Sequence, residues 1–544
     1  MGKFCDPKAI HLNRDFLTAL AHLSVRRPQM FRRLVILSSL CLLNTTQLSA
    51  QLPAVLASNP EPPKGFVFVS AQDGAVGSTM TLQQLQQGQR KTEQPQEPLI
   101  VKPAAEPSPA LKYRLYPARW ELRPGSALLH YARAQMLFSQ MPKEKQSEWQ
   151  MWFSDDKQPD DSELELAVVA LQHVFEELHD LAQSEDLTWD HRVRDLRGPE
   201  VYSYLLPDVQ EVRTMARMLR LKIKHQLKQQ DFGGAISSIS DGLRLAEFVG
   251  QGETLIQKLV GIAVASIMRE CIQDAIATPG CPNLYWALAT IPQPLVNVSE
   301  SVLWELSNVQ RVLPALAEAE TANWTEEESV RKWGSVVGDL KTLTGLDGAD
   351  DNGIQLALAI ASVTFVDAAR ARLSAGGLSD QRLSEMPAMH IVLLDASREL
   401  RRVGDDLGRA HLLPASLSKP LFESEDARFQ QWIGENRLSS VGAAVAGIVF
   451  PAVRQAKEAE TRMLLGHNRL MTIEALRMHA AQHNGDVPKS LDELSPVPAM
   501  LDPYTNKPME YRVDDINGSQ TVYLKAAGPL NFKPLQELEM RFVK

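Results

Sequence analysis

A helical period of apolar residues runs through the middle of this chain, over residues 113–435. In one segment the apolar residues recur every three or four positions, at Val212, Met215, Leu219, Ile223 and Leu227. That spacing places them on one face of an α-helix, and Pro207-Asp208 mark its start. Strand signals are nearly absent before residue 508. We therefore expect a mainly all-α protein, with a body at 113–435 large enough for a substantial core.

Two features describe the expected body more closely. A second helix, marked by Ile236, Ile239, Leu243 and Ala246, follows the first after a short turn at Gln230–Gly234. The pair resembles an α-helical hairpin of tetratricopeptide type, although the full repeat consensus and a second copy are absent. The next helix, Thr254–Ala277, is apolar nearly all round, so we expect it to be the central buried helix. Further helices are expected near 297–321, 325–343, 354–374 and 386–409.

The N-terminal region has the three parts of a secretory signal peptide. Arg32-Arg33 form a basic head, Leu34–Leu43 an apolar core, and Ala50 ends a stretch of small and polar residues. The apolar core is too short to span a bilayer, which needs roughly 20 residues. We expect residues 1–50 to be an N-terminal extension and signal peptide (core 30–50) cleaved after Ala50. A buried or incidental apolar run is the alternative.

Residues 51–112 have the composition of a disordered linker. They are rich in Pro, Gln, Ser and Gly and lack an apolar period. Such a segment cannot bury enough apolar surface to offset the entropy lost on ordering. We expect this linker to hold the folded part away from the membrane or cell wall.

Charge and cysteine content limit the classes of partner. The chain carries a net charge of −9, and its first 50 residues are basic, so the remainder is more acidic still. An acidic protein is a poor candidate for binding nucleic acid. After signal cleavage only Cys271 and Cys281 remain. Export permits a disulfide between them; two unpaired cysteines, one in a helix core, are the alternative.

The C-terminal part, residues 440–544, changes pattern. Ser440–Asn484 is expected to be one long helix that Gly485 closes and Pro488 prevents from resuming. Ser490 can cap a short helix through Leu494. Two strands, Met509–Val513 and Thr521–Ala526, are joined by a turn sequence and predict a hairpin.

This order of elements resembles the globular end of a type II secretion pseudopilin or type IV pilin-like subunit. Asp502-Pro503-Tyr504-Thr505-Asn506-Lys507-Pro508 is similar to the Asp-Pro-aromatic turn of pseudopilins, with Asn506 in place of the usual Gly. Both residues tolerate positive φ. Separately, Glu121–Ala127 and Thr278–Leu288 resemble a family of exported bacterial helical proteins of uncharacterised function, over residues 113–528. The resemblances imply a secreted helical protein with a pilin-like module and no known activity.

The module also departs from the pilin pattern. Leu530 stands where the Asp of the pseudopilin calcium loop is expected, which puts a calcium site in doubt. The apolar part of the helix, Val441–Phe450, is half the length of a membrane span, and no prepilin leader precedes it. We therefore expect the module to dock rather than to enter a pilus.

The candidate ligand and catalytic residues each have a simpler interpretation. His479 and His483 lie four residues apart on a helix, so both rings could face one metal ion. His467 falls on a similar face of the helix. The zinc-protease motif, however, is absent. An exposed helix end is the alternative. Asp347, Asp350 and Asp351 do not match an EF-hand and are expected in a loop. Paired acids flank a further loop, at Asp155, Asp156, Asp160 and Asp161.

No catalytic or cofactor-binding motif is found, so the expected catalytic residues and cofactors are none. Six tryptophans are expected to pack in the core: Trp149, Trp152, Trp286, Trp304, Trp324 and Trp333. The leading hypothesis is a non-catalytic exported scaffold or protein-binding protein, periplasmic or extracellular, whose partner is another exported or envelope protein. The mature chain is expected to have no membrane span. The alternatives are a component or client of a type II secretion or pilus-like apparatus, and an enzyme whose site is not visible in sequence.

Overall fold

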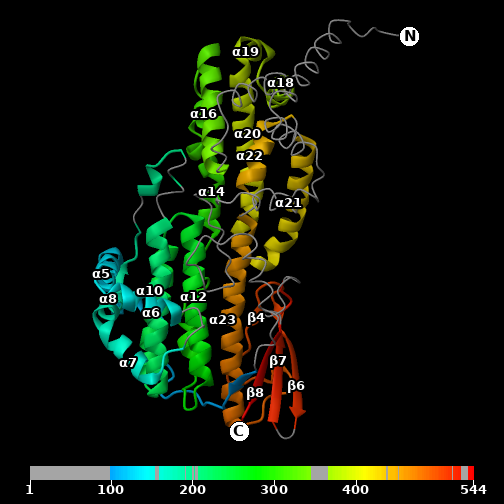
Figure 1. Cartoon of the computed structure of the whole chain (residues 1–544). Coiled ribbons are helices and arrows are strands. Elements are labelled where there is room, and N and C mark those ends of the chain that lie inside the picture. The colour runs from blue at the N-terminus through cyan, green and yellow to red at the C-terminus, as the bar shows by residue number, and fades with distance from the viewer. Residues whose placement is uncertain are drawn as a thin grey trace, which may run out of the picture.

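The computed structural model shows an elongated, mainly helical protein with a small sheet at one end (Figure 1). The described residues are 98–543 without 153–157, 190–191, 199–200, 202–205, 345–364, 437–438, 451–452, 517–518 and 529–536. The predicted signal peptide and its cleavage site at Ala50 lie outside them, as does the predicted linker before residue 98. The expected mainly helical class with a C-terminal sheet region is confirmed.

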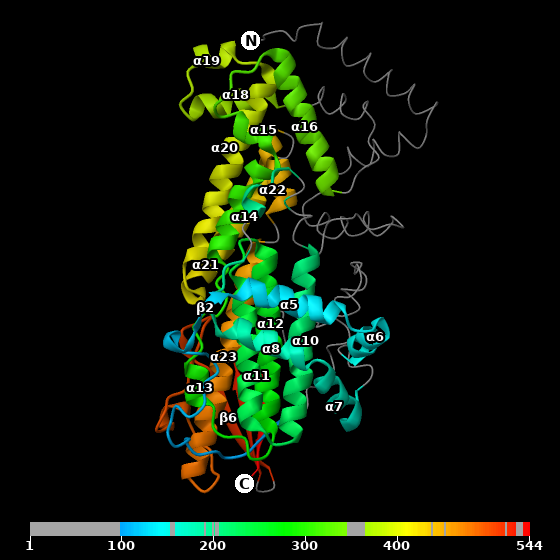
Figure 2. The same ribbon diagram turned by 90° about the vertical axis from the view of Figure 1, so that its left-hand side faces the viewer.

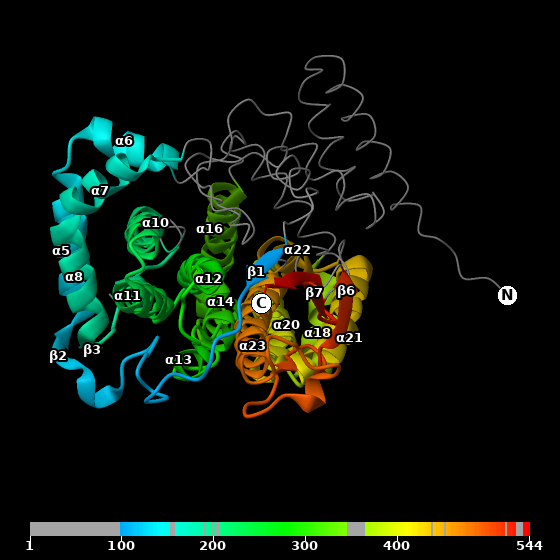
Figure 3. The same ribbon diagram turned by 90° about the horizontal axis from the view of Figure 1, so that it is seen from below.

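The sheet end of the molecule is built around long helices, α10 (Leu206–Lys228), α11 (Phe232–Gly250), α12 (Leu255–Ala277) and α23 (Val453–Gln482). α12 packs against α10 and α11 on one side and against α23 on the other (Figure 3). Because neighbours cover it all round, an apolar sequence all round is stable there. The prediction that α12 is buried is confirmed, since it contains Val260, Ile262 and Val264, which are all buried.

The α10–α11 hairpin has a tighter turn than the sequence suggests. α11 begins at Phe232, whereas the sequence predicts a turn through Gly234. Gln230 takes a φ of 58°, and the Asp231 side chain accepts a hydrogen bond from the Gly234 amide as the N-cap. A Cβ at residue 234 would lie 2.1 Å from Asp231 Oδ2. The absence of a side chain at Gly234 therefore leaves room for the capping carboxylate, and this glycine lies within the helix rather than in the turn.

A layer of shorter helices covers α10 and α11 on the outside (Figures 2 and 3). This outer layer consists of α5 (Ala127–Ser139), α6 (Lys143–Trp152), α7 (Asp161–Ala170) and α8 (Gln172–Gln183). Two short strands, β2 (Arg123–Ser126) and β3 (Ser184–Asp186), pair in parallel beside it. The sequence did not predict them, because neither has a strand period.

The opposite end of the molecule is a second group of helices around α20 (Figure 2). Its members are α14 (Ser299–Val312), α15 (Pro314–Glu318), α16 (Glu326–Thr344), α18 (Val366–Ala375), α19 (Asp380–Glu385), α20 (Ala388–Arg409), α21 (Ala415–Asn436) and α22 (Val441–Val449). α14 also reaches α12 and α23, so the two ends share one continuous apolar core.

The sequence predicts one helix over Ser440–Asn484, but the structure has two. α22 ends at Val449 and α23 begins at Val453, and Pro451 stands between them. Proline lacks the N–H that a helix interior needs and collides with the preceding turn. Gly485 closes the second helix with a φ of 90°, as predicted.

The C-terminal sheet has four strands in the order β1-β8-β7-β6 rather than the predicted two-stranded hairpin. β6 (Glu510–Ile516) and β7 (Ser519–Lys525) pair antiparallel as expected. β8 (Glu537–Phe542) and β1 (Leu99–Val101) were not predicted. The sequence predicts a linker to residue 112, but Leu99 pairs in parallel with Met540, so the folded part includes β1. The remaining short strands are β4 (Leu501–Asp502) and β5 (Lys507–Pro508).

Candidate functional site

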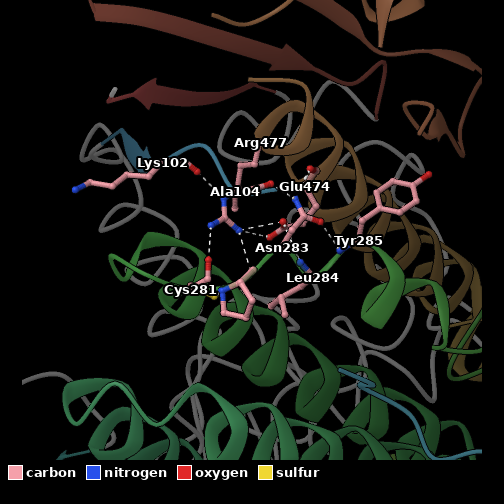
Figure 4. A network of polar contacts seen from close by, with 9 residues as sticks. Lys102, Ala104, Cys281, Asn283, Leu284, Tyr285, Glu474 and Arg477 are labelled. Atoms are coloured by element: carbon pink, nitrogen blue, oxygen red, sulfur yellow. Dashed lines mark hydrogen bonds and ion pairs between the residues drawn. The ribbon is translucent and has the colours of Figure 1, made fainter. Parts of the chain in front are cut away.

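A buried ion pair on α23 lies at the centre of the polar network in Figure 4. Glu474 and Arg477 stand three residues apart on the helix, so their side chains are neighbours. Their exposed fractions are 0% and 2%. Arg477 Nη1 donates to both carboxylate oxygens of Glu474, at 2.7 and 3.0 Å. Burial raises the pKa of Glu474, while Arg477 acts in the opposite direction.

The remaining donors of Arg477 hold two other segments of the chain. Its Nε donates to the Lys102 carbonyl and its Nη2 to the Cys281 carbonyl, both at 2.9 Å. The Glu474 carboxylate accepts a further hydrogen bond from the Leu284 amide at 3.1 Å. We call this set of contacts the Arg477 junction. It ties the segment after β1 and the loop between α12 and α13 (Tyr285–Ala289) to α23.

Asn283 completes the junction (Figure 4). Its Nδ2 donates to the main-chain carbonyls of Glu474, at 2.8 Å, and Ala104, at 3.2 Å, while its Oδ1 accepts from the Tyr285 amide at 3.0 Å. The Ala104 amide donates to the Arg477 carbonyl at 3.1 Å. Since the charged and amide side chains all have partners, the junction is suited to holding segments together. The stretch Thr278–Leu288 supplies its loop.

The two histidines suggested as metal ligands stack on one another instead. The rings of His479 and His483 are 3.9 Å apart with an angle of 11° between their planes. His483 Nδ1 lies 2.8 Å from the His479 carbonyl and is engaged there. Burial lowers the pKa of His479, and His483 lowers it further. The structure brings no third ligand to this pair among the described residues, and His467 lies in the wall of a separate cavity.

Cys271 and Cys281 are both buried and form no disulfide with each other. The structure thus has the second of the two arrangements considered from the sequence, in which both cysteines are unpaired. Burial raises the pKa of the Cys281 thiol to about 12 and that of Cys271 further. Because the thiolate is the reactive form, both side chains are poor nucleophiles at neutral pH.

The acidic candidates do not form a catalytic pair in the described part of the chain. Asp160 is the N-cap of α7 and accepts from the Glu163 amide at 2.8 Å. Asp161 forms an ion pair with Lys228. The other acids that the sequence singled out lie outside the described residues: Asp155, Asp156, Asp347, Asp350 and Asp351.

The tryptophans pack as expected. Trp149, Trp152 and Trp333 are buried, at 3%, 4% and 5% exposure. Trp286, Trp304 and Trp324 are partly buried and pack against the same core. Core packing is therefore confirmed for all six side chains.

Sequence reasoning missed a group of possible metal ligands in the outer layer. One ligand atom from each of His130, Glu177 and Asp180 lies within 4.8 Å of the others. His130 Nδ1 is 2.7 Å from a Glu177 oxygen. Arg133 and Arg123 lie 4.0 and 3.6 Å from the two carboxylates. These cations already balance the acids, so the group is better described as an ion-pair network. The 47-residue separation of His130 from Glu177 gives no sequence signal.

The outer layer also exposes apolar side chains that sequence reasoning did not single out. Its helices bury one face against α10 and α11, and they expose several large apolar residues on the other face. These are Leu129 and Met136 of α5, Met151 of α6, and Leu166 and Val169 of α7, exposed by 52%, 53%, 53%, 70% and 64%. Exposed apolar groups that gather in one region are typical of interaction surfaces.

The turn at Asp502–Pro508 has the positive φ that its sequence allows at Asn506. Asn506 has a φ of 54°, as its substitution for glycine predicts. The buried Asp502 carboxylate accepts from the amides of Tyr504 and Ala527, at 2.8 and 2.7 Å. Ser490 caps a short helix of three residues by accepting from the Asp492 amide. Leu530 lies outside the described residues.

Comparison with protein-family models, curated proteins and solved structures finds no match for this chain. Among the described helices, none combines the length and the apolar composition needed to cross a bilayer.

Proposed function

We propose that this protein is a non-catalytic exported scaffold that binds another exported or envelope protein through its outer layer. The observation that supports the proposal is the two-sided apolar character of α7. Leu164 and Ala167 face the core at 0% and 3% exposure, while Leu166 and Val169 are 70% and 64% exposed. A surface helix normally keeps apolar residues on one face only.

The same pattern continues on α5. Tyr131 and Ala134 are buried, whereas Leu129 and Met136 are more than half exposed. Apolar side chains at helical spacing fit a partner that offers an amphipathic helix or an apolar groove. The acidic charge of the chain, −9 in total, favours a partner whose contact surface is rimmed by basic residues.

The test compares two pairs of exposed apolar residues. The double variant Leu166→Ser/Val169→Ser removes the α7 surface. Leu412→Ser/Leu417→Ser removes residues that are 61% and 60% exposed in the separate group of helices around α20. Each protein is isolated from its native envelope fraction, and co-purifying proteins are quantified. We expect a partner to be lost with the first pair and retained with the second. Equal recovery with both variants would contradict the proposal, as would an intact N-terminus on a cytosolic protein.

A component or client of a type II secretion or pilus-like apparatus is the second candidate. The conformation of Asn506 and the buried Asp502 turn favour it, because both match the pseudopilin pattern. In that case the co-purified partner is expected to be a subunit of such an apparatus. The two candidates share the outer-layer test and differ in the identity of the protein recovered.

A further inference from the structure

Three arginines lie at the interface between α12 and α23, and two of them lack an acceptor among the described residues. Arg269 belongs to α12, and Arg462 and Arg469 belong to α23. Arg469 is only 7% exposed, and its Nε and Nη2 are buried without a hydrogen-bond partner. Arg269 makes no hydrogen bond or ion pair in the described part of the chain. A buried guanidinium group whose N–H groups have no acceptor is costly and calls for an explanation.

Gly466 brings these side chains together. A Cβ at this position would lie 2.7 Å from Cδ and Nη1 of Arg269, so a larger residue would displace the Arg269 side chain. Arg462 precedes Gly466 by four residues and Arg469 follows it by three, which places all three positions on one face of the helix. Burial lowers the pKa of Arg469 to about 10, and the nearby charge of Arg269 contributes to the shift.

The acids near this group are engaged elsewhere. Glu270 forms an ion pair with Arg220 at 3.0 Å. Asp502 accepts from two backbone amides. Glu458 accepts a hydrogen bond from the Tyr504 hydroxyl at 2.5 Å. The charge of Glu270 favours the cationic form of Arg269, and that of Asp502 favours the cationic form of Arg469. In the described residues, however, no hydrogen bond joins Asp502 or Glu458 to either arginine.

A small cavity adjoins Arg269, one of the three arginines. Its volume is about 40 Å³, and its lining includes Arg269, Ser266, His467, Met463 and Leu470. That volume accommodates a few water molecules or a small ion. Burial lowers the pKa of His467 to about 4, so its ring is neutral at pH 7 and retains one N–H donor. The cavity therefore offers cationic and neutral donors within an apolar wall.

We propose that Arg269 and Arg469 bind a small oxyanion at the α12–α23 interface, beside Gly466. The planar guanidinium group favours ligands with two or more oxygens, so the class comprises inorganic oxyanions and short carboxylates. The bound anion joins α12 to α23 by accepting hydrogen bonds from both side chains. This site is independent of the outer layer and of the proposed function.

The test measures stabilisation of the full chain by sulfate and, separately, by acetate. Each is added at millimolar concentration, with sodium chloride adjusted to constant ionic strength. A ligand at ten times its dissociation constant shifts the unfolding equilibrium by about elevenfold. We expect a shift of this kind for the wild type and for the control Arg512→Met, whose side chain lies on the exposed part of the sheet. The shift is expected to disappear in Arg269→Met and Arg469→Met. A larger shift with sulfate identifies a tetrahedral ligand, and a larger shift with acetate a carboxylate.

Equal shifts in all four proteins would show a general salt effect and overturn the proposal. If neither arginine variant folds, calorimetric titration of the wild-type protein with sulfate and acetate decides the question. Saturable binding with a dissociation constant below about 10 mM supports the site, because an affinity of that order is needed for the stabilisation described above. The absence of such binding for both ions overturns the proposal. Gly466→Ala provides a further check, because it displaces Arg269 and should weaken the binding measured in the same titration.

Discussion

The Arg477 junction allows a direct test of how charge is held inside this protein. Arg477→Met leaves the Glu474 carboxylate, which is 0% exposed, with the Leu284 amide as its one hydrogen-bond donor among the described residues. It also removes the Arg477 donors from the carbonyls of Lys102 and Cys281. Breaking a buried pair typically costs about 3–5 kcal/mol, and a stranded polar group about 1–3 kcal/mol. Since these costs overlap, we expect the free energy of unfolding to fall by about 4 kcal/mol.

Urea unfolding followed by tryptophan fluorescence measures this loss, and hydrogen exchange of the Leu99–Val101 amides reports whether β1 is released. The double variant Glu474→Leu/Arg477→Met should recover part of the stability, because it removes both charges together. Lys525→Met breaks an exposed pair with Glu510 and should leave the urea midpoint unchanged. The reasoning is refuted if Arg477→Met behaves like Lys525→Met, or if the double variant is no more stable than the single one.

Two titratable groups with shifted pKa values predict opposite responses to pH. Burial raises the pKa of Glu305 to about 7, above its ordinary value of 4.5, so the folded state binds the extra proton and stability falls as pH rises from 4.5 to 7. Urea unfolding at pH 5 and pH 8 measures the change in the free energy of unfolding between these two values. In Glu305→Gln the part of this change that comes from Glu305 should be absent. Burial lowers the pKa of His411 to about 3, so the unfolded state takes up the proton first and stability falls as pH drops below 6.5. His411→Gln should reduce this acid sensitivity, and an unchanged slope between pH 6.5 and 4 would contradict the assignment.

Local patterns predicted the parts of the fold that depend on near neighbours in the chain. The all-round apolar sequence of Leu255–Ala277 identified the buried helix, because composition alone shows that no face tolerates water. Turn chemistry identified Gly485, Asn506 and Ser490, since positive φ and capping depend on one residue and its neighbours. The break before α23 was missed, although Pro451 marked it.

Distant contacts account for the features that sequence reasoning missed. β1 has three residues, too few to show a period, and it becomes a strand only through pairing with β8. Glu474 and Arg477 look like an ordinary surface pair on a helix. Their burial follows from segments almost 200 and 375 residues away, at Cys281 and Lys102. The arginine group at Gly466 likewise forms only where α12 packs against α23, so neither helix sequence alone predicts it.

The pairing of β1 with β8 also has a consequence for the order of events in folding. Leu99 is synthesised early but must wait for Met540, its partner in the sheet. At about 5–20 residues per second, the intervening chain takes on the order of a minute to emerge from the ribosome. During that time β1 has no strand to pair with, whereas α10 and α11, which follow one another in the chain, can already pack together. Contacts of such high sequence separation form slowly. β1 therefore joins the sheet only after β8 has been synthesised, whereas the α10–α11 hairpin can form much earlier.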